Sequence, residues 1–194
     1  MTVAVAYGRA QLGIEAPLVS VEVYLAGGLP RFSIVGLPQT AVRESKDRVR
    51  AALMSSGFEW PQRNIIVSLR PADMPKSGGR FDLAIALAIL AAAKQVPNEQ
   101  LTGYEFYGEL SLDGGIRGVP GLLPASRQAA RISRPVFVAA DNRAEATLAG
   151  AEVLVASSLL QVVAHLNGTQ PIEPTADYEP TQAATQHPDL ADVR

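Results

Sequence analysis

The chain has 194 residues, of which 47% are hydrophobic, and a net charge of −2, as expected for one folded domain with a single core. It has no cysteine and only two histidines, His165 and His187, which excludes thiol nucleophiles, disulfides and thiolate metal sites and argues against a histidine-based metal site or a serine–histidine triad. No charged leader precedes an apolar core at the N-terminus, and no apolar run approaches the roughly 20 residues that cross a bilayer, so we expect a cytoplasmic protein without a membrane partner.

The pattern of apolar residues predicts strands and helices in alternation. In chain order we expect strands over 2–8, 19–26 and 32–35, a helix over 39–56, a strand over 64–69, a helix over 83–93, a strand over 104–112, a helix over 122–131, a strand over 136–139, and a helix, a strand and a helix within 142–166. The first three strands are expected to be joined by hairpins. This order predicts an α+β or α/β domain with a mixed sheet covered by helices.

Two segments differ from the rest in composition. Leu, Ile and Ala fill almost every position of the helix over 83–93, so we expect this helix to be buried on most of its circumference. Residues 167–189 consist mainly of Gly, Thr, Gln, Pro, Asp and Glu, a composition that cannot bury enough surface to order itself. We therefore predict a folded domain over 1–166 and a flexible linker over 167–194.

The loop that opens into the buried helix is the place where a site is expected. Its glycines allow a close approach of the backbone, and the first helical turn offers free N–H groups. Lys76 precedes these glycines instead of following them, unlike the lysine of a phosphate-binding loop. Asp82 either belongs to a site or complements the helix N-terminus. Ser77 is either a nucleophile or a turn hydroxyl, and its neighbour Lys76 is poorly placed as a base because adjacent side chains on an extended loop point apart.

Positive charge is concentrated in the first part of the chain. Residues 1–80 hold ten Lys and Arg against six Asp and Glu, whereas residues 81–194 hold seven against thirteen. The candidate DNA-binding residues are cations on the first helix or close to it in sequence: Arg43, Lys46, Arg50 and Arg63. Glu44 and Asp47 are interleaved on the same helix, so a solvated face of mixed charge is the alternative interpretation. Phe58 and Trp60 are either stacking residues or core residues.

Four segments carry a resemblance to a known family. They are the opening over residues 4–58, RPADMPKSGGRFDLAIALAIL over 70–90, GELSLDGGIRGVPGLLPA over 108–125 and HPDLADVR over 187–194. Together they resemble the amino-terminal domain of the ComM/YifB proteins, bacterial relatives of the magnesium-chelatase ATPase subunit, and this domain is similar to the proteolytic domain of Lon. The resemblance implies a Lon-like fold, built as in domain 2 of ribosomal protein S5.

The resemblance also implies a function. ComM-like proteins are hexameric AAA+ DNA helicases that act in branch migration during natural transformation, so the expected partners are DNA and further copies of the chain. The ATP-binding module would follow residue 194, so ATP and Mg²⁺ belong to the parent protein and no cofactor is expected here. A purely structural oligomerisation collar is the alternative, with apolar segments over 118–123 and 29–38 as its interface.

The Lon resemblance places unreactive side chains at both catalytic positions. Arg80 falls on the position of the Lon nucleophilic serine, and Leu123 falls on that of the general-base lysine. A guanidinium cannot attack a carbonyl carbon and an aliphatic side chain cannot accept a proton, so we expect no catalytic residues and no peptidase activity. A residual Ser-Lys peptidase formed by Lys76 and Ser77 is the remaining alternative. Magnesium insertion is not expected, because no cluster of His or carboxylates has metal-ligand spacing.

Overall fold

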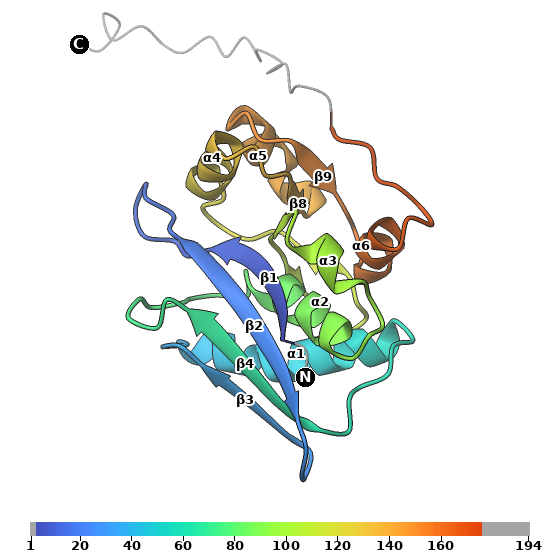
Figure 1. Cartoon of the computed structure of the whole chain (residues 1–194). Coiled ribbons are helices and arrows are strands. Elements are labelled where there is room, and N and C mark those ends of the chain that lie inside the picture. Colours follow the sequence, from blue (N-terminus) through green and yellow to red (C-terminus); the bar gives the residue numbers. More distant parts are fainter. Residues whose placement is uncertain (1–2, 176–194) are drawn as a thin grey trace, which may run out of the picture.

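The first half of the chain forms a four-stranded sheet with two long helices on one face (Figure 1). The computed structural model describes residues 3–175, except for the side chains of Ala41 and Arg43. The elements of this half are β1 (Ala4–Arg9), β2 (Leu18–Ala26), β3 (Arg31–Val35), α1 (Thr40–Ser55), β4 (Asn64–Arg70) and α2 (Asp82–Ala92).

The sheet is mixed, as predicted, but its strand order differs from the expected row of hairpins. The order is β1-β2-β4-β3, in which β2 pairs antiparallel with both β1 and β4, and β3 pairs parallel with β4. The prediction of a hairpin between β2 and β3 is therefore wrong. The inward-facing residues of β4, Ile65, Val67 and Leu69, are fully buried, whereas the residues of β3 are at least partly exposed. The more buried strand takes the interior position, and α1 forms the crossover that makes β3 and β4 parallel.

Helix α2 is the centre of the core. Its residues from Asp82 to Ala91 are all buried, which confirms the expectation from its composition. It packs against the strands β1 and β2 and against α1, and it also contacts α3, β5 and β6. A helix surrounded in this way exposes none of its first turn to solvent, so the charged groups there need partners inside the protein.

The second half forms a smaller parallel sheet and a short hairpin. Its elements are α3 (Asn98–Leu101), β5 (Glu105–Phe106), β6 (Glu109–Leu110), β7 (Ile116–Arg117), α4 (Leu123–Arg131), β8 (Val136–Val138), the 3-10 turn η1 (Ala140–Asn142), α5 (Arg143–Leu148), β9 (Val153–Val155) and α6 (Leu159–Leu166). The sheet order is β5-β8-β9, and β6 pairs antiparallel with β7 around the predicted Asp-Gly-Gly turn. The helix α3 has no counterpart among the predicted elements.

The single strand predicted over 104–112 is wrong, because the chain divides it between two sheets. The break falls at Gly108, whose carbonyl accepts from the N–H of Leu83 and whose N–H donates to the carbonyl of Arg80. A Cβ at Gly108 would lie 2.3 Å from Cγ2 of Ile116. Only glycine lets the chain pass this close to Ile116 of β7 while it bonds to the start of α2, and this passage interrupts the strand.

The start of the predicted linker contacts the domain. Ile172 packs against the main core, and its N–H donates to Nδ1 of His165 over 2.9 Å. The N–H of Thr175 donates to the carbonyl of Val153, the first residue of β9, over 2.8 Å. The rest of the predicted linker, residues 176–194 with His187, lies outside the described residues. In residues 3–175, no helix is long and apolar enough to span a membrane.

Candidate functional site

The loop before α2 is held in place from both sides. Lys76 forms an isolated parallel bridge with Pro38, and its carbonyl accepts from the N–H of Gln39. Its side chain is buried, and Nζ donates to the carbonyl of Pro71. Burial lowers the pKa of Lys76, and Asp73 partly offsets this effect. The amine is therefore engaged by the backbone of its own loop, while the neighbouring Ser77 is half-buried.

Arg80 fills the space between this loop and the segment before α4. Its guanidinium donates to the carbonyls of Arg9 (3.3 Å), Pro120 (2.5 Å) and Gly121 (3.5 Å) and to Oε1 of Gln11 (3.4 Å). The side chain is 3% exposed, and burial lowers its pKa despite the favourable influence of Tyr107. The contact brings the loop before α2 against the loop that leads to Leu123.

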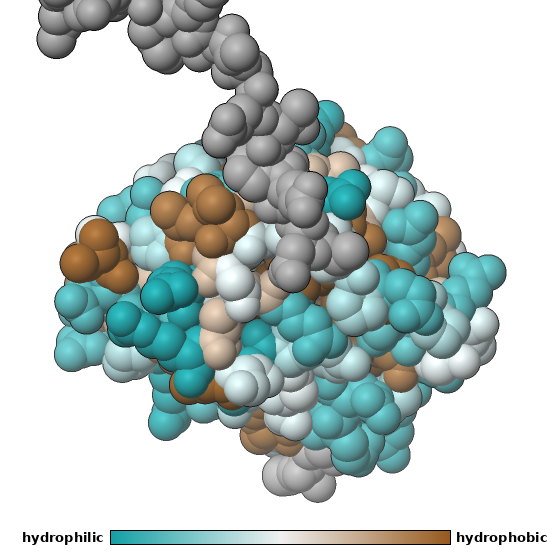
Figure 2. All heavy atoms as spheres, turned by 90° about the horizontal axis from the view of Figure 1, so that it is seen from above, coloured by the Kyte–Doolittle hydropathy of each residue, from teal (hydrophilic) through white to brown (hydrophobic). Residues whose placement is uncertain are grey.

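Leu123 lies at the surface beside this contact. It begins α4, its side chain is 40% exposed, and its N–H donates to Oε1 of Glu145 over 2.7 Å. With Ile14, Leu148 and Arg127 it lines a hollow of about 630 Å³, which we call the apolar hollow. Figure 2, which views the molecule from the side of α4 and α5, shows apolar residues exposed among hydrophilic ones on this face.

A buried ionic cluster that the sequence did not predict lies next to Arg80. Arg9 binds both carboxylate oxygens of Glu105, each over 2.9 Å, and the hydroxyl of Tyr107 donates to the same carboxylate over 2.5 Å. Arg134 lies 3.6 Å from Glu105 and covers the ring of Tyr7. Burial, followed by the charge of Glu105, raises the pKa of Tyr107 well above its ordinary value. The cluster joins β1 to β5 and the end of α4.

Asp82 joins the two long helices. It stands in the first turn of α2, and its carboxylate accepts from Nε of Arg48 (2.6 Å), from a terminal nitrogen of Arg48 (3.2 Å) and from the N–H of Leu110 (3.3 Å). Burial raises the pKa of Asp82 to about 6, against the opposing effect of Arg48. The sequence prediction included a helix-end role for Asp82, but its partner Arg48 was not among the candidate residues.

The structure brings together three of the four candidate DNA-binding residues. Lys46 and Arg50 of α1 and Arg63, which precedes β4, are exposed and line one hollow of about 110 Å³. We call this the basic hollow. The side chain of the fourth candidate, Arg43, lies outside the described part of the structure. No described carboxylate lies within ion-pair distance of the three cations, and Glu44 and Asp47 of α1 are exposed without lining the hollow.

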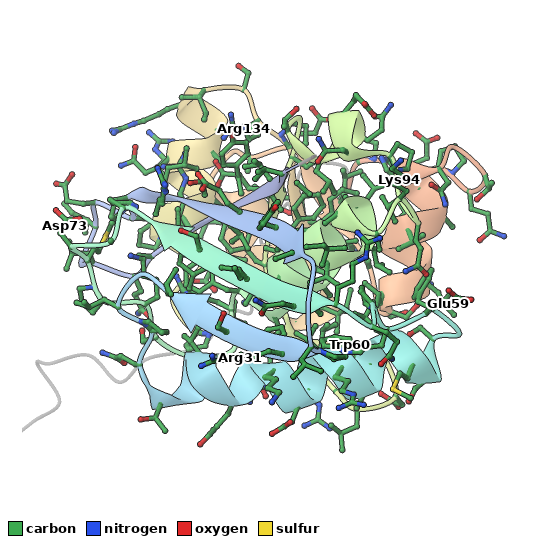
Figure 3. The ribbon with its side chains drawn as sticks, turned by 60° about the horizontal axis from the view of Figure 1, so that its bottom comes forward. Arg31, Glu59, Trp60, Asp73, Lys94 and Arg134 are labelled. Carbon is green, nitrogen blue, oxygen red and sulfur yellow. The ribbon has the colours of Figure 1, made fainter. Side chains whose placement is uncertain are left out.

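Two further residues of the basic hollow are Arg31, which the sequence did not indicate, and Trp60, which the sequence offered as a stacking or a core residue. Both line the hollow, and Figure 3 labels them, Arg31 at the start of β3 and Trp60 in the segment between α1 and β4. The guanidinium of Arg50 lies 5.8 Å from the centre of the Trp60 ring. The parallel register pairs Arg31 with Asn64 and so brings it beside Arg63. The hairpin expected from the sequence would have placed Arg31 elsewhere, so no sequence signal identified it.

Residues 3–175 offer no obvious metal centre. No group of three or more His, Asp or Glu side chains in this part of the chain is arranged to hold an ion.

Comparison with known proteins identifies the family. The model of the family described as subunit ChlI of Mg-chelatase matches residues 21–142. The YifB protein of Escherichia coli is 44% identical over 194 residues, which cover 100% of this chain and 38% of the relative. The competence protein ComM of Haemophilus influenzae is 47% identical over 171 residues, 88% of this chain and 34% of the relative. A Mycobacterium tuberculosis protein is 42% identical over 193 residues, 97% of this chain and 38% of the relative.

These matches assign the chain to the class of Mg-chelatase-like proteins. The chain belongs to this family and is a ComM/YifB-type protein. It spans little more than a third of the length of the relatives it matches.

Asp82→Asn is expected to remove a pH dependence of stability. The pKa of Asp82 is about 6 in the folded chain against an ordinary 3.8. Between these values the folded chain binds more protons than the unfolded chain, so the free energy of unfolding falls as pH rises. The shift corresponds to a loss of about 3 kcal/mol over this interval. Urea unfolding at several pH values should show the fall in the unsubstituted chain and not in Asp82→Asn. The control is Asp47→Asn on the exposed face of α1, and an equal slope in all three chains would contradict the assignment.

Arg80→Ser is expected to destabilise the chain without creating a nucleophile. Loss of the guanidinium leaves the carbonyls of Arg9, Pro120 and Gly121 without this donor, at a cost of about 3 kcal/mol in urea unfolding. Neither the unsubstituted chain nor Arg80→Ser should react with a fluorophosphonate probe, because Leu123 supplies no base. Labelling of the unsubstituted chain that disappears in Ser77→Ala would show that Ser77 is a nucleophile and overturn this expectation.

Proposed function

We propose that this chain is a non-proteolytic, Lon-like domain that contributes to assembly and engages DNA in a hexameric AAA+ helicase. In this proposal the parent protein drives branch migration during natural transformation or recombination, and ATP and Mg²⁺ bind to a module outside this chain. The domain contacts the sugar-phosphate backbone, and the ATP-binding module of the parent protein moves the DNA.

The basic hollow is the observation that carries the proposal. Arg31, Lys46, Arg50 and Arg63 come from three separate segments, and no described carboxylate pairs with any of them. Surface cations are usually interspersed with anions, and a group left without them favours phosphate. The net charge of −2 is unfavourable for non-specific attraction to DNA, so a local cluster of cations must supply the binding energy.

The relatives and the interior contacts support the same proposal. The Haemophilus influenzae relative is named a competence protein, which fits a role in the uptake or recombination of DNA. The contact of Arg80 with Pro120 and Gly121 joins the two segments on which the resemblance to Lon rests. Arg80 and the buried Lys76 donate to backbone carbonyls, so we locate the proposed DNA site in the basic hollow and not at these two residues.

Binding of the 194-residue chain to duplex DNA should depend on salt. Contacts from the four cations of the basic hollow predict a slope of roughly −4 for the logarithm of affinity against the logarithm of salt concentration. Lys46→Glu combined with Arg63→Glu should abolish binding in fluorescence anisotropy with a labelled duplex.

The matched control for this experiment is Arg127→Glu combined with Arg131→Glu. These two arginines are exposed on α4, beside the apolar hollow, and their substitution changes the net charge by the same amount. Equal losses in the two double variants would mean that total charge and not the basic hollow governs binding. Salt-insensitive binding would contradict the proposal outright.

A structural collar is the second candidate, favoured by two groups of exposed apolar side chains. Leu29, before β3, is 89% exposed and Leu37, after β3, is 60% exposed, whereas Ile14 is 81% exposed and Leu148 is 66% exposed around the apolar hollow. Closed rings use two different surfaces of each subunit, and these two groups are the candidates for them. The residues around Leu37 and Leu123 fall within the segments predicted as an interface, although Val119 and Leu122 of the second segment are buried in the core.

Self-association through the apolar hollow should be disrupted by Ile14→Asp combined with Leu148→Asp. A carboxylate at either position would have to lose its hydration at an apolar contact, so the mass from light scattering should fall towards that of a monomer. Leu160→Asp, at an exposed position of α6, should leave the mass unchanged. A chain that is monomeric at every concentration tested would contradict the collar function.

A further inference from the structure

Trp60 is the only tryptophan of the chain, and it lines two hollows at once. One is the basic hollow. The other, of about 580 Å³, is also lined by Leu25, Pro61 and Lys94, and we call it the Trp60 hollow. Its volume lies within the range of roughly 300–1,000 Å³ typical of small-ligand sites. Gln62 and Arg63 line both hollows as well, so the two are neighbours that meet at Trp60.

The ring of Trp60 is fixed before any ligand arrives. Phe32 of β3 stacks on it with ring centres 5.9 Å apart and ring planes inclined by 26°, and both rings pack against the main core. The preceding residue, Glu59, is bound to the side-chain amide of Gln95, which follows α2. The N–H of Glu59 donates to Oε1 of Gln95 over 3.0 Å, and Nε2 of Gln95 donates to the carbonyl of Glu59 over 2.9 Å. A platform held in this way loses little conformational freedom on binding.

The position of Arg50 shows that a planar group can lie over this ring. Its guanidinium is 5.8 Å from the ring centre, and Arg50 is exposed. A cation–π contact at an exposed site is weak compared with the stacking of a nucleobase on an aromatic side chain. A base can therefore take the place of the guanidinium, and Arg50 is then free to turn towards a phosphate.

The charges around Trp60 give the ligand an orientation. Arg31, Lys46, Arg50 and Arg63 line the basic hollow without a carboxylate, whereas the Trp60 hollow sets the carboxylate of Glu59 against Lys94 and Arg63. A phosphate is therefore attracted more strongly to the basic hollow. The backbone lies there, and the uncharged base of the same nucleotide lies over the ring of Trp60, where the two hollows meet.

We propose that Trp60 binds one unpaired nucleobase of a single DNA strand whose phosphates occupy the basic hollow. This inference rests on the proposed function, since it uses the same cations for the backbone. A base inside a duplex is covered on both faces by its neighbours and cannot reach a half-buried indole. A base in a single strand can turn out and stack. The site thus selects single-stranded DNA, or the single-stranded part of a branched substrate.

The test uses the fluorescence of Trp60, which is the whole tryptophan emission of the chain. We expect an oligothymidylate to quench this emission and a blunt duplex of the same length to leave it nearly unchanged. Trp60→Leu should lower the affinity for the oligothymidylate by about tenfold, measured by anisotropy, and leave the affinity for the duplex unchanged. Trp60→Phe should retain most of the affinity, because the smaller ring still stacks.

Phe58→Leu is the matched control, because Phe58 is a half-buried aromatic residue of the same loop that lines neither hollow. Equal losses in Phe58→Leu and Trp60→Leu would indicate a loosened loop and would overturn the stacking inference. Salt-dependent binding of both DNA forms that Trp60→Leu does not alter would also overturn it, while leaving the proposed function intact. Absence of binding to either DNA form would refute both proposals.

Discussion

The burial of α2 on all sides is the constraint on which the rest of the structure depends. Its first turn lies deep in the protein, so Arg80 and Asp82 cannot be solvated and each needs a partner of fixed geometry. Arg80 finds carbonyls from β1 and from the loop before α4, and Asp82 finds Arg48 of α1. The charged groups at the mouth of one helix therefore connect four segments that are remote in sequence.

The pairing of Arg48 with Asp82 also determines what α1 shows to solvent. Residues advance by about 100° each around an α-helix, so a side chain two positions away points to the opposite side. Lys46 and Arg50 are both two positions from Arg48, and they are four positions from each other. Turning Arg48 inwards to Asp82 therefore turns Lys46 and Arg50 outwards together, where Arg31 and Arg63 meet them. The buried ion pair and the exposed basic hollow are two consequences of one helix orientation.

Local pattern was enough to predict the long helices, the mixed sheet and the burial of α2, because each depends on which residues in a short window are apolar. It failed where partners come from elsewhere in the chain. The alternation in β3 shows that it is a strand but not that β4 lies between it and β2. The apolar run over 104–112 gives no sign that Gly108 must pass close to Ile116. The same limit applies to the site, where Lys46 and Arg50 follow from helical spacing, whereas Arg31 and Arg48 depend on strand register and on a buried partner.

Two groups of cations in the described part of the chain differ in how their charge is satisfied. Arg9, Lys76 and Arg80 are buried, and carboxylate or carbonyl oxygens already occupy their donors. A buried group that already donates to protein oxygens is poorly accessible to a ligand, and exposing it would cost the protein its internal contacts. The cations of the basic hollow lie at the surface, where the described part of the chain supplies no carboxylate to pair with them. A phosphate ligand would give these residues the counter-charge that the fold gives to the buried cations. The buried cations therefore stabilise the domain, and the exposed cations are available to bind a phosphate.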